Sequence, residues 1–228
     1  MDNPQTVSDL LESFQQFLVV IIHNILYCRG VYPAESFERV RIYDAVVYEC
    51  RHYGVRDWIE QLAGSCMKQI GEGNVKKISI VILRDRDRAP LERFVLDLRA
   101  FPQMDPLDQG ERVIDMGSIS WSSIEQEYRS CVRTLFSTGE DLGKACNETV
   151  TFTVLLEARE EVGFDSQMTT KEDSPWISAD YSKHGPLRPL VAKPIRFANN
   201  GPTSFNFYME ESKTKQKMPI TTESGQTT

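Results

Sequence analysis

The chain has 228 residues, of which 40% are hydrophobic and 26% are charged, and its formal net charge at pH 7 is −7. This is an ordinary globular composition, and a domain of this length buries enough surface to be stable without disulfides or a structural metal. The negative charge argues against sequence-independent binding to DNA or RNA, which needs clustered lysine and arginine side chains.

The cysteines and the N-terminus indicate an intracellular protein. The five cysteines are odd in number, widely spaced and free of C-x-x-C pairs, as is typical of reduced thiols in the cytosol or nucleus. The first residues lack the basic start of a signal peptide. The longest apolar run, residues 17–22, is far shorter than the ~20 residues that span a membrane. We therefore expect no membrane segment.

The first predicted element is a helix. Residues 6–30 carry apolar side chains at the three- and four-residue spacing of an α-helix. Thr6 and Asp9 form a candidate capping box at its start, and Gly30 followed by Pro33 predicts its end. Apolar residues extend around nearly the whole circumference in the middle of this segment, so we expect the helix to lie at the centre of the fold.

Strand and helix patterns then alternate. Residues 41–50 predict one strand, and residues 55–70 predict a second helix that ends at the glycines of 71–74. Residues 76–83 and 91–98 are rich in β-branched and alternating apolar side chains. Because a short charged turn joins them, we predict that they form a β-hairpin.

The second half of the chain becomes irregular toward its end. Residues 101–118 predict a loop, residues 121–136 a third helix, and residues 149–158 a strong central strand. Residues 160–203 contain prolines and scattered charges without a period, and residues 205–210 predict a short strand. This order indicates an α+β fold, with three helices packed on one face of a mostly antiparallel sheet.

The sequence gives little support for catalysis. The three histidines lack the H-x-x-H and H-E-x-x-H spacings of metal sites, and no G-x-S-x-G is present. His23, inside the first helix, is expected to be a satisfied core histidine. The alternative is a thiol-dependent hydrolase, although none of the five cysteines has a supporting signature. We therefore expect no enzymatic activity, no metal and no cofactor.

Five short stretches, in order and at compatible spacing, resemble the HORMA-domain family. They are ILYCRGVYP (25–33), IVIL with APLERFV (80–95), FTVLLEARE (152–160), SPWISAD (174–180) and FYMEE (207–211). The resemblance covers residues 4–211 and points to the subfamily that provides accessory subunits of translesion DNA polymerase zeta.

The resemblance implies one HORMA domain over residues 1–211. Its core would be 1–159, and residues 160–211 would form a C-terminal "seat belt" that wraps around a short partner peptide. Residues 212–228 are a polar tail that we expect to be disordered. The irregular composition of 160–203 suits a segment that crosses a surface, and a peptide beneath it would add as a strand to an open sheet edge.

The function implied by the resemblance is that of a nuclear, non-catalytic adaptor in DNA-damage tolerance. It would trap a linear, Pro-containing peptide of the polymerase zeta catalytic subunit and bridge it to the C-terminal domain of a second, scaffold-type translesion polymerase. A homodimer or HORMA heterodimer and an ATP-driven HORMA remodeller are further implied partners, with no direct nucleic-acid binding. The alternative is a spindle-checkpoint HORMA protein that inhibits a cell-cycle ubiquitin ligase.

The resemblance assigns Tyr32, Trp58 and Trp176 to the peptide-binding site. Trp58 stands where the subfamily carries a tyrosine, so any hydrogen bond from that hydroxyl is lost. Each assignment has a structural alternative. Trp176 would pack into the chain's own core, Trp58 would be a core position on an amphipathic helix, and Tyr32 would be a turn residue packed beside Pro33.

The resemblance also implies a second partner surface and a self-association residue. Leu187, Asn206 and Tyr208 align with residues that bind the scaffold polymerase, and Asn206 stands where a longer amide is usual. For Asn206 and Tyr208 the alternative is a solvent-facing side of a strand. Arg129, in the third helix, matches an arginine used in self-association, and its alternative is a solvated helix face.

Overall fold

The computed structural model describes residues 6–73, 75–99, 113, 119–142, 148–159, 176, 190–199 and 204–212. The helices are α1 (Val7–Cys28), α2 (Tyr53–Gly71) and α3 (Trp121–Leu142), with a short 3-10 turn at Ala34–Ser36. The strands are β1 (Phe37–Ile42), β2 (Ala45–Cys50), β3 (Val75–Arg84), β4 (Pro90–Asp97), β5 (Val150–Ala158), β6 (Leu190–Ala198) and β7 (Phe205–Ser212). All three predicted helices are present.

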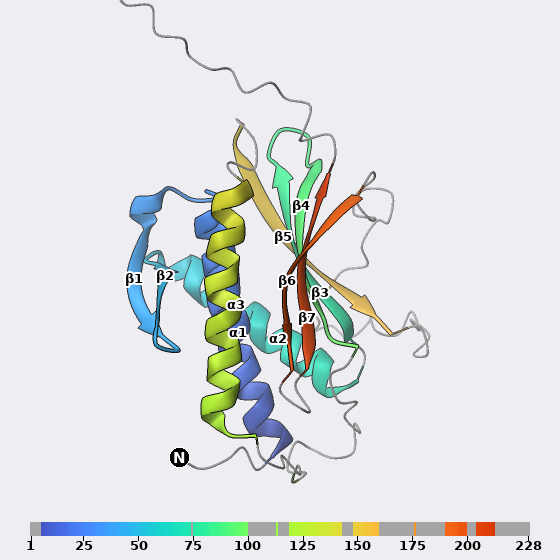
Figure 1. Cartoon of the computed structure of the whole chain (residues 1–228). Helices are drawn as coiled ribbons and strands as arrows, with labels where there is room; N and C mark the ends of the chain where they lie inside the picture. The colour runs from blue at the N-terminus through green and yellow to red at the C-terminus, as the bar shows by residue number, and fades with distance from the viewer. Residues whose placement is uncertain are drawn as a thin grey trace, which may run out of the picture.

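The strands form two antiparallel sheets with the helices between them. Strands β1 and β2 pair with each other, and the larger sheet has the order β5-β3-β4-β7-β6. Figure 1 shows the helices lying between the β1–β2 hairpin and the five-stranded sheet. The predicted α+β class, the mostly antiparallel sheet and the β3–β4 hairpin are therefore confirmed. The small sheet on the far side of the helices is an additional layer.

Helix α1 forms the centre of the fold, as its sequence predicts. The Thr6 hydroxyl accepts a hydrogen bond from Asp9 N–H at 3.2 Å, and the Asp9 carboxylate accepts one from Thr6 N–H at 2.9 Å. The helix ends at Cys28, and Gly30, just beyond the cap residue Arg29, takes a left-handed φ of +62° that glycine adopts without strain. Among the described helices, α1 is long and apolar enough to cross a membrane, but 67% of its most apolar 18-residue stretch is buried inside the fold. Its apolarity is that of a core helix.

Three strand predictions are wrong. Residues 190–198, within the segment expected to be irregular, form strand β6. The other two errors concern how strands pair. Residues 41–50 are not one strand, because Tyr43 and Asp44, with φ of +51° and +57°, form the tight turn between β1 and β2. Such a turn is usually marked by Asn-Gly or Asp-Gly, and Tyr-Asp gives no such signal. Strand β5 is not central but lies at the edge of its sheet, because the β6–β7 hairpin docks on β4 and not on β5.

Two polar side chains of α1 hold the β1–β2 hairpin. Asn24 accepts a hydrogen bond from Tyr48 N–H at 2.9 Å and donates one to the Val20 carbonyl at 2.7 Å. His23 Nδ1 accepts one from Cys50 N–H at 3.4 Å. These bonds satisfy two amides of β2 that no neighbouring strand reaches among the described residues. The expectation that His23 is a satisfied core histidine is therefore confirmed.

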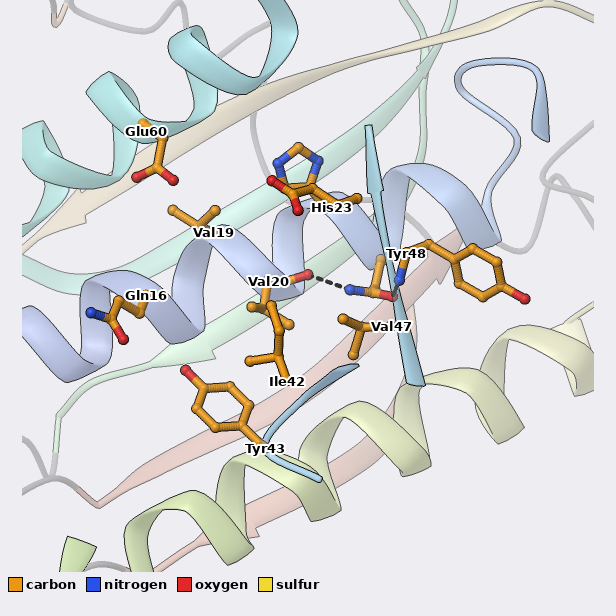
Figure 2. Close-up of a pocket in the computed structure, with 11 residues that line it drawn as sticks. Gln16, Val19, Val20, His23, Ile42, Tyr43, Val47, Tyr48 and Glu60 are labelled. Atoms are coloured by element: carbon orange, nitrogen blue, oxygen red, sulfur yellow. Dashed lines mark hydrogen bonds between the residues drawn. The ribbon is translucent and has the colours of Figure 1, made fainter. Parts of the chain in front are cut away.

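A pocket of about 240 Å³ lies between α1, the hairpin and α2 (Figure 2). Val20 and Val47 give the pocket an apolar wall, and the His23 side chain also lines it. Glu49 and Glu60 also line it, and Arg56 pairs with Glu49 at 2.9 Å. The lining residues of this pocket come from α1, α2 and the β1–β2 hairpin, and none comes from the five-stranded sheet.

The burial of His23 makes folding depend on pH. Burial, with a smaller contribution from the Arg56 guanidinium, lowers the pKa of His23 from 6.5 to about 4. Between these values the unfolded chain binds a proton that the folded chain excludes, so the free energy of unfolding falls as pH falls below 6.5. We expect His23 to account for a loss of about 2 kcal/mol between pH 7.5 and pH 5.

Urea unfolding of the wild type and of His23→Asn at the two pH values tests this expectation. Asparagine places an acceptor near the position of Nδ1 but does not titrate. The difference in the free energy of unfolding between the wild type and His23→Asn should therefore shrink as the pH falls. An equal loss of stability in both proteins would show that other groups cause it.

Candidate functional site

The outer edge of β5 is an open backbone edge beside the helices. On one side β5 pairs with β3 from Val150 to Ala158, and no described strand pairs with its other side. An edge strand presents a row of backbone N–H and C=O groups that can accept another strand. This edge can therefore hydrogen-bond an extended peptide without any change in the sheet.

The β5 side chains that point toward the helices are apolar and incompletely covered. The register with β3 places Phe152, Val154 and Leu156 beside the fully buried isoleucines of β3. They share that face, because alternate residues of a strand point the same way. All three are only half-buried. The helix-facing side of β5 thus forms an apolar wall that further apolar side chains could cover.

Trp58 lies against this wall and not in the core. The buried residues of α2 are Ile59, Ala63, Cys66, Met67 and Ile70. The Trp58 side chain is instead 46% exposed, and its ring packs edge-to-face on Phe152 with centroids 5.4 Å apart. The structure therefore brings the predicted aromatic residue to β5, and its exposed part is available for contact with a ligand.

Trp176 is also held against α2. Its indole N–H donates a hydrogen bond to the Ser65 hydroxyl at 2.7 Å, and the half-buried ring packs against the hydrophobic core. Trp176 therefore packs on the chain's own core while part of its ring stays exposed, and its role in peptide binding stays a prediction. We define a candidate surface, called the groove below, as the β5 edge together with Trp58, Ser65, Phe152 and Trp176.

Tyr32 lies away from this groove. It is half-buried, it packs against the core beside Cys50 of β2, and its burial raises the pKa of its phenol. Cys50 belongs to the hairpin, on the other side of the helices from the five-stranded sheet. The structure thus groups two of the three predicted peptide-binding residues, and the role of Tyr32 stays a prediction.

The predicted second surface lies on the opposite face of the large sheet. Asn206 pairs with Asp97 and Tyr208 with Val95, whereas Phe207 between them is buried toward the helices. Asn206 is exposed, and Tyr208 is half-buried, which raises the pKa of its phenol. Leu187 lies outside the described residues. The two described residues therefore share a face that is separate from the groove.

Arg129 makes contacts within its own chain. Its Nε donates to the Tyr43 carbonyl at 2.6 Å, and its guanidinium lies 3.5 Å from the Asp44 carboxylate. The guanidinium groups of Arg41 and Arg129 hold the pKa of Asp44 below its usual range. Arg129 thus fixes the β1–β2 turn to α3, and its role in self-association stays a prediction.

Two polar residues near the groove carried no signal in the sequence. Ser65 is a single serine inside a helix, and only the position of Trp176 reveals its contact. Arg159 follows β5 and donates to the Val75 and Leu98 carbonyls, each at 3.2 Å, which ties the end of β5 to β3 and β4. Within the described residues, no cluster of three His, Cys, Asp or Glu side chains could hold a metal ion.

Residues 11–169 match the family model of the HORMA domain. The DNA polymerase zeta processivity subunit of Arabidopsis thaliana is 27% identical over 208 residues, which cover 90% of this chain and 86% of that protein. The mitotic spindle assembly checkpoint protein MAD2B of Homo sapiens is 31% identical over 178 residues, which cover 77% of each chain.

Two solved structures illustrate the likeness of the fold. A chain of the mitotic checkpoint complex has a TM-score of 0.66 at 18% identity, covering 89% of this chain and 98% of that one. C. elegans HTP-1 bound to the HIM-3 closure motif also has a TM-score of 0.66, at 14% identity and 90% coverage of each chain. At these identities the structures establish the shared architecture.

Proposed function

The chain belongs to the HORMA-domain family, and from that premise we propose that it is a non-catalytic adaptor that captures a linear peptide at the edge of β5. The observation that carries this proposal is the open β5 edge, with Trp58 packed on Phe152 of β5 and Trp176 held on the same helix as Trp58. The relative from Arabidopsis is named as a subunit of DNA polymerase zeta. We therefore propose that the peptide is a Pro-containing segment of the polymerase zeta catalytic subunit.

The peptide would bind as an added strand. Its backbone would pair with β5, and alternate side chains would contact Phe152 and the two indoles of the groove. Backbone pairing is independent of side chains, so the groove would supply the selectivity. The solved structure of HTP-1, which shares this fold and has a closure motif bound, supports the capture of a short segment.

Residues 160–211 would act as the seat belt of the single domain 1–211. Arg159 is fixed at the end of β5, Trp176 contacts α2, and β6 begins at Leu190 on the opposite edge of the sheet. The chain has to connect these anchors, and we propose that it closes over the captured peptide. Release would then be slow, because part of the fold must detach first. An ATP-driven HORMA remodeller would speed that step.

Co-expression with fragments of the polymerase zeta catalytic subunit from the same organism tests this proposal. The expected result is that one Pro-containing linear segment co-purifies and protects residues 160–203 from protease. Failure of every fragment to bind would refute the proposed partner. A co-purifying segment from a regulator of a cell-cycle ubiquitin ligase would favour the checkpoint role, which the name of the human relative keeps as the alternative.

The second surface would bridge the captured peptide to another polymerase in the nucleus. Asn206 and Tyr208 lie on the sheet face away from the helices, where they do not compete with the groove. The proposed partner there is the C-terminal domain of a scaffold-type translesion polymerase. Self-association through Arg129, as a homodimer or a HORMA heterodimer, is part of the same proposal.

Tyr208→Ala should separate the two surfaces. We expect it to weaken binding of the scaffold polymerase domain by about 2 kcal/mol, as for a moderately strong aromatic contact, and to leave the captured peptide unaffected. Tyr208→Phe is the matched control, because it keeps the ring that packs beside Val95. Pull-downs with both partners measure the effect. Loss of both partners together would contradict the model of two independent surfaces.

A further inference from the structure

Ser65 occupies a particular stripe of α2. Trp58, Leu62 and Ser65 are spaced by four and three residues, which places them on one side of the helix. All three are less buried than the core stripe that includes Ile59 and Cys66. The contact of Trp58 with Phe152 shows that this side borders β5. Ser65 is therefore a polar position on the helical wall of the groove.

The Ser65 hydroxyl is the acceptor for the Trp176 indole. An indole N–H is a donor only, so a half-buried tryptophan loses free energy unless an acceptor lies within reach. The observed separation of 2.7 Å is at the short end of the range for an N–H···O bond. The two residues are 111 positions apart in the chain. This bond thus joins the proposed seat belt to helix α2.

A fixed hydrogen bond also fixes the orientation of the ring. The indole has one N–H on its edge, and holding that edge on α2 determines which part of the ring faces the groove. Apolar packing against the core allows a ring to rotate or slide, whereas a directional bond selects one arrangement. The hydroxyl oxygen of Ser65 therefore helps to set the orientation of the Trp176 ring.

We propose that Ser65 is a positioning residue for peptide capture, which holds the Trp176 indole on α2 and so slows release of the bound strand. This inference rests on the proposed function for its effect on the peptide. The bond itself, however, is a property of the free protein. The effect of the Ser65 hydroxyl has to be separated from that of side-chain shape, because any substitution in α2 also alters helix packing.

Two substitutions of equal shape make that separation. Ser65→Thr keeps the hydroxyl, and Ser65→Val has the same branched shape without it. Both have the same branching at Cβ and similar helix propensity, so their cost to α2 is comparable. Each is combined with Trp176→Phe, which removes the indole N–H. If the bond acts as proposed, the Ser65→Thr and Ser65→Val proteins release the peptide at different rates. This difference in release rate disappears when Trp176→Phe is also present.

The first measurement uses the free protein. The chain has three tryptophans, so a spectrum of the 15N-labelled protein contains three indole N–H signals, and Trp176→Phe identifies the one that belongs to Trp176. Ser65→Val should shift that signal and speed its exchange with solvent, whereas Ser65→Thr should leave it close to the wild type. A signal that is the same in both variants would overturn the inference.

The second measurement is the release rate of a labelled synthetic peptide with the sequence of the co-purified polymerase segment. Ser65→Val should raise the rate about 5- to 10-fold, as for loss of one hydrogen bond, and Ser65→Thr should stay within about twofold of the wild type. Equal release from both variants, with capture by the wild type intact, would overturn this inference alone. Absence of capture by the wild type would overturn the proposed function and the inference with it.

Discussion

Trp176→Ala should weaken binding of the captured peptide by about 2–4 kcal/mol, the range for a central aromatic anchor. The indole is half-buried, and its N–H is hydrogen-bonded to Ser65 of α2, the helix whose Trp58 packs on Phe152 of β5. Alanine removes both the ring surface that a bound strand would contact and the bond to Ser65. Calorimetric titration with the co-purified polymerase peptide measures the loss.

Trp176→Phe serves as the intermediate control, because it keeps an aromatic ring but no N–H donor. The affinity of the Trp176→Phe variant for the peptide should lie between those of the wild type and the alanine variant. The peptide-free proteins should have similar unfolding transitions, since Trp176 is not among the fully buried residues of the described core. Unchanged peptide binding by a folded alanine variant would remove Trp176 from the groove.

Arg29→Met should lower the free energy of unfolding by about 3–5 kcal/mol, the cost of leaving a buried charge without its partner. Arg29 lies at the end of α1, and its guanidinium contacts the Glu92 carboxylate of β4 at 2.7 and 2.9 Å. Both side chains are completely buried. Glu211 of β7 is the register partner of Glu92 and is also buried. Loss of the cation would therefore leave two carboxylates close together in the interior.

Chemical denaturation of Arg29→Met and of a double variant, Arg29→Met with Glu92→Leu, tests this explanation. The double variant removes both charges of the pair, so it should recover part of the stability that the single variant loses. Glu211 retains its ion pair with Lys193 at 3.2 Å in both proteins. A double variant less stable than the single one would show that Glu92 is held mainly by other contacts.

Local patterns in the sequence predict the helices well. The capping box of Thr6 and Asp9 and the left-handed Gly30 mark the two ends of α1, and both depend on residues only a few positions apart. The β3–β4 hairpin is predictable for the same reason, since its strands are separated by a short charged turn. These elements require no knowledge of the rest of the chain.

The pairing of distant strands is not visible in such patterns. Strand β5 has the apolar composition of a central strand, yet it lies at the edge because β7 pairs with β4. Similarly, Trp58 fits the amphipathic pattern of α2, but it contacts Phe152 instead of the core. Family resemblance indicated Trp176, whereas Ser65 could be recognised only from coordinates, because a single helical serine has many possible uses.

The place of β7 in the sheet has a consequence for biosynthesis. Phe207 and Met209 cover Leu96 and Phe94 in register, and all four side chains are buried. Strand β4 emerges from the ribosome long before β7, which is near the C-terminus. Until β7 has been synthesised, β4 therefore has one unpaired edge, which can pair with other polypeptides. Premature stop codons upstream of β7 would give products that never complete the domain.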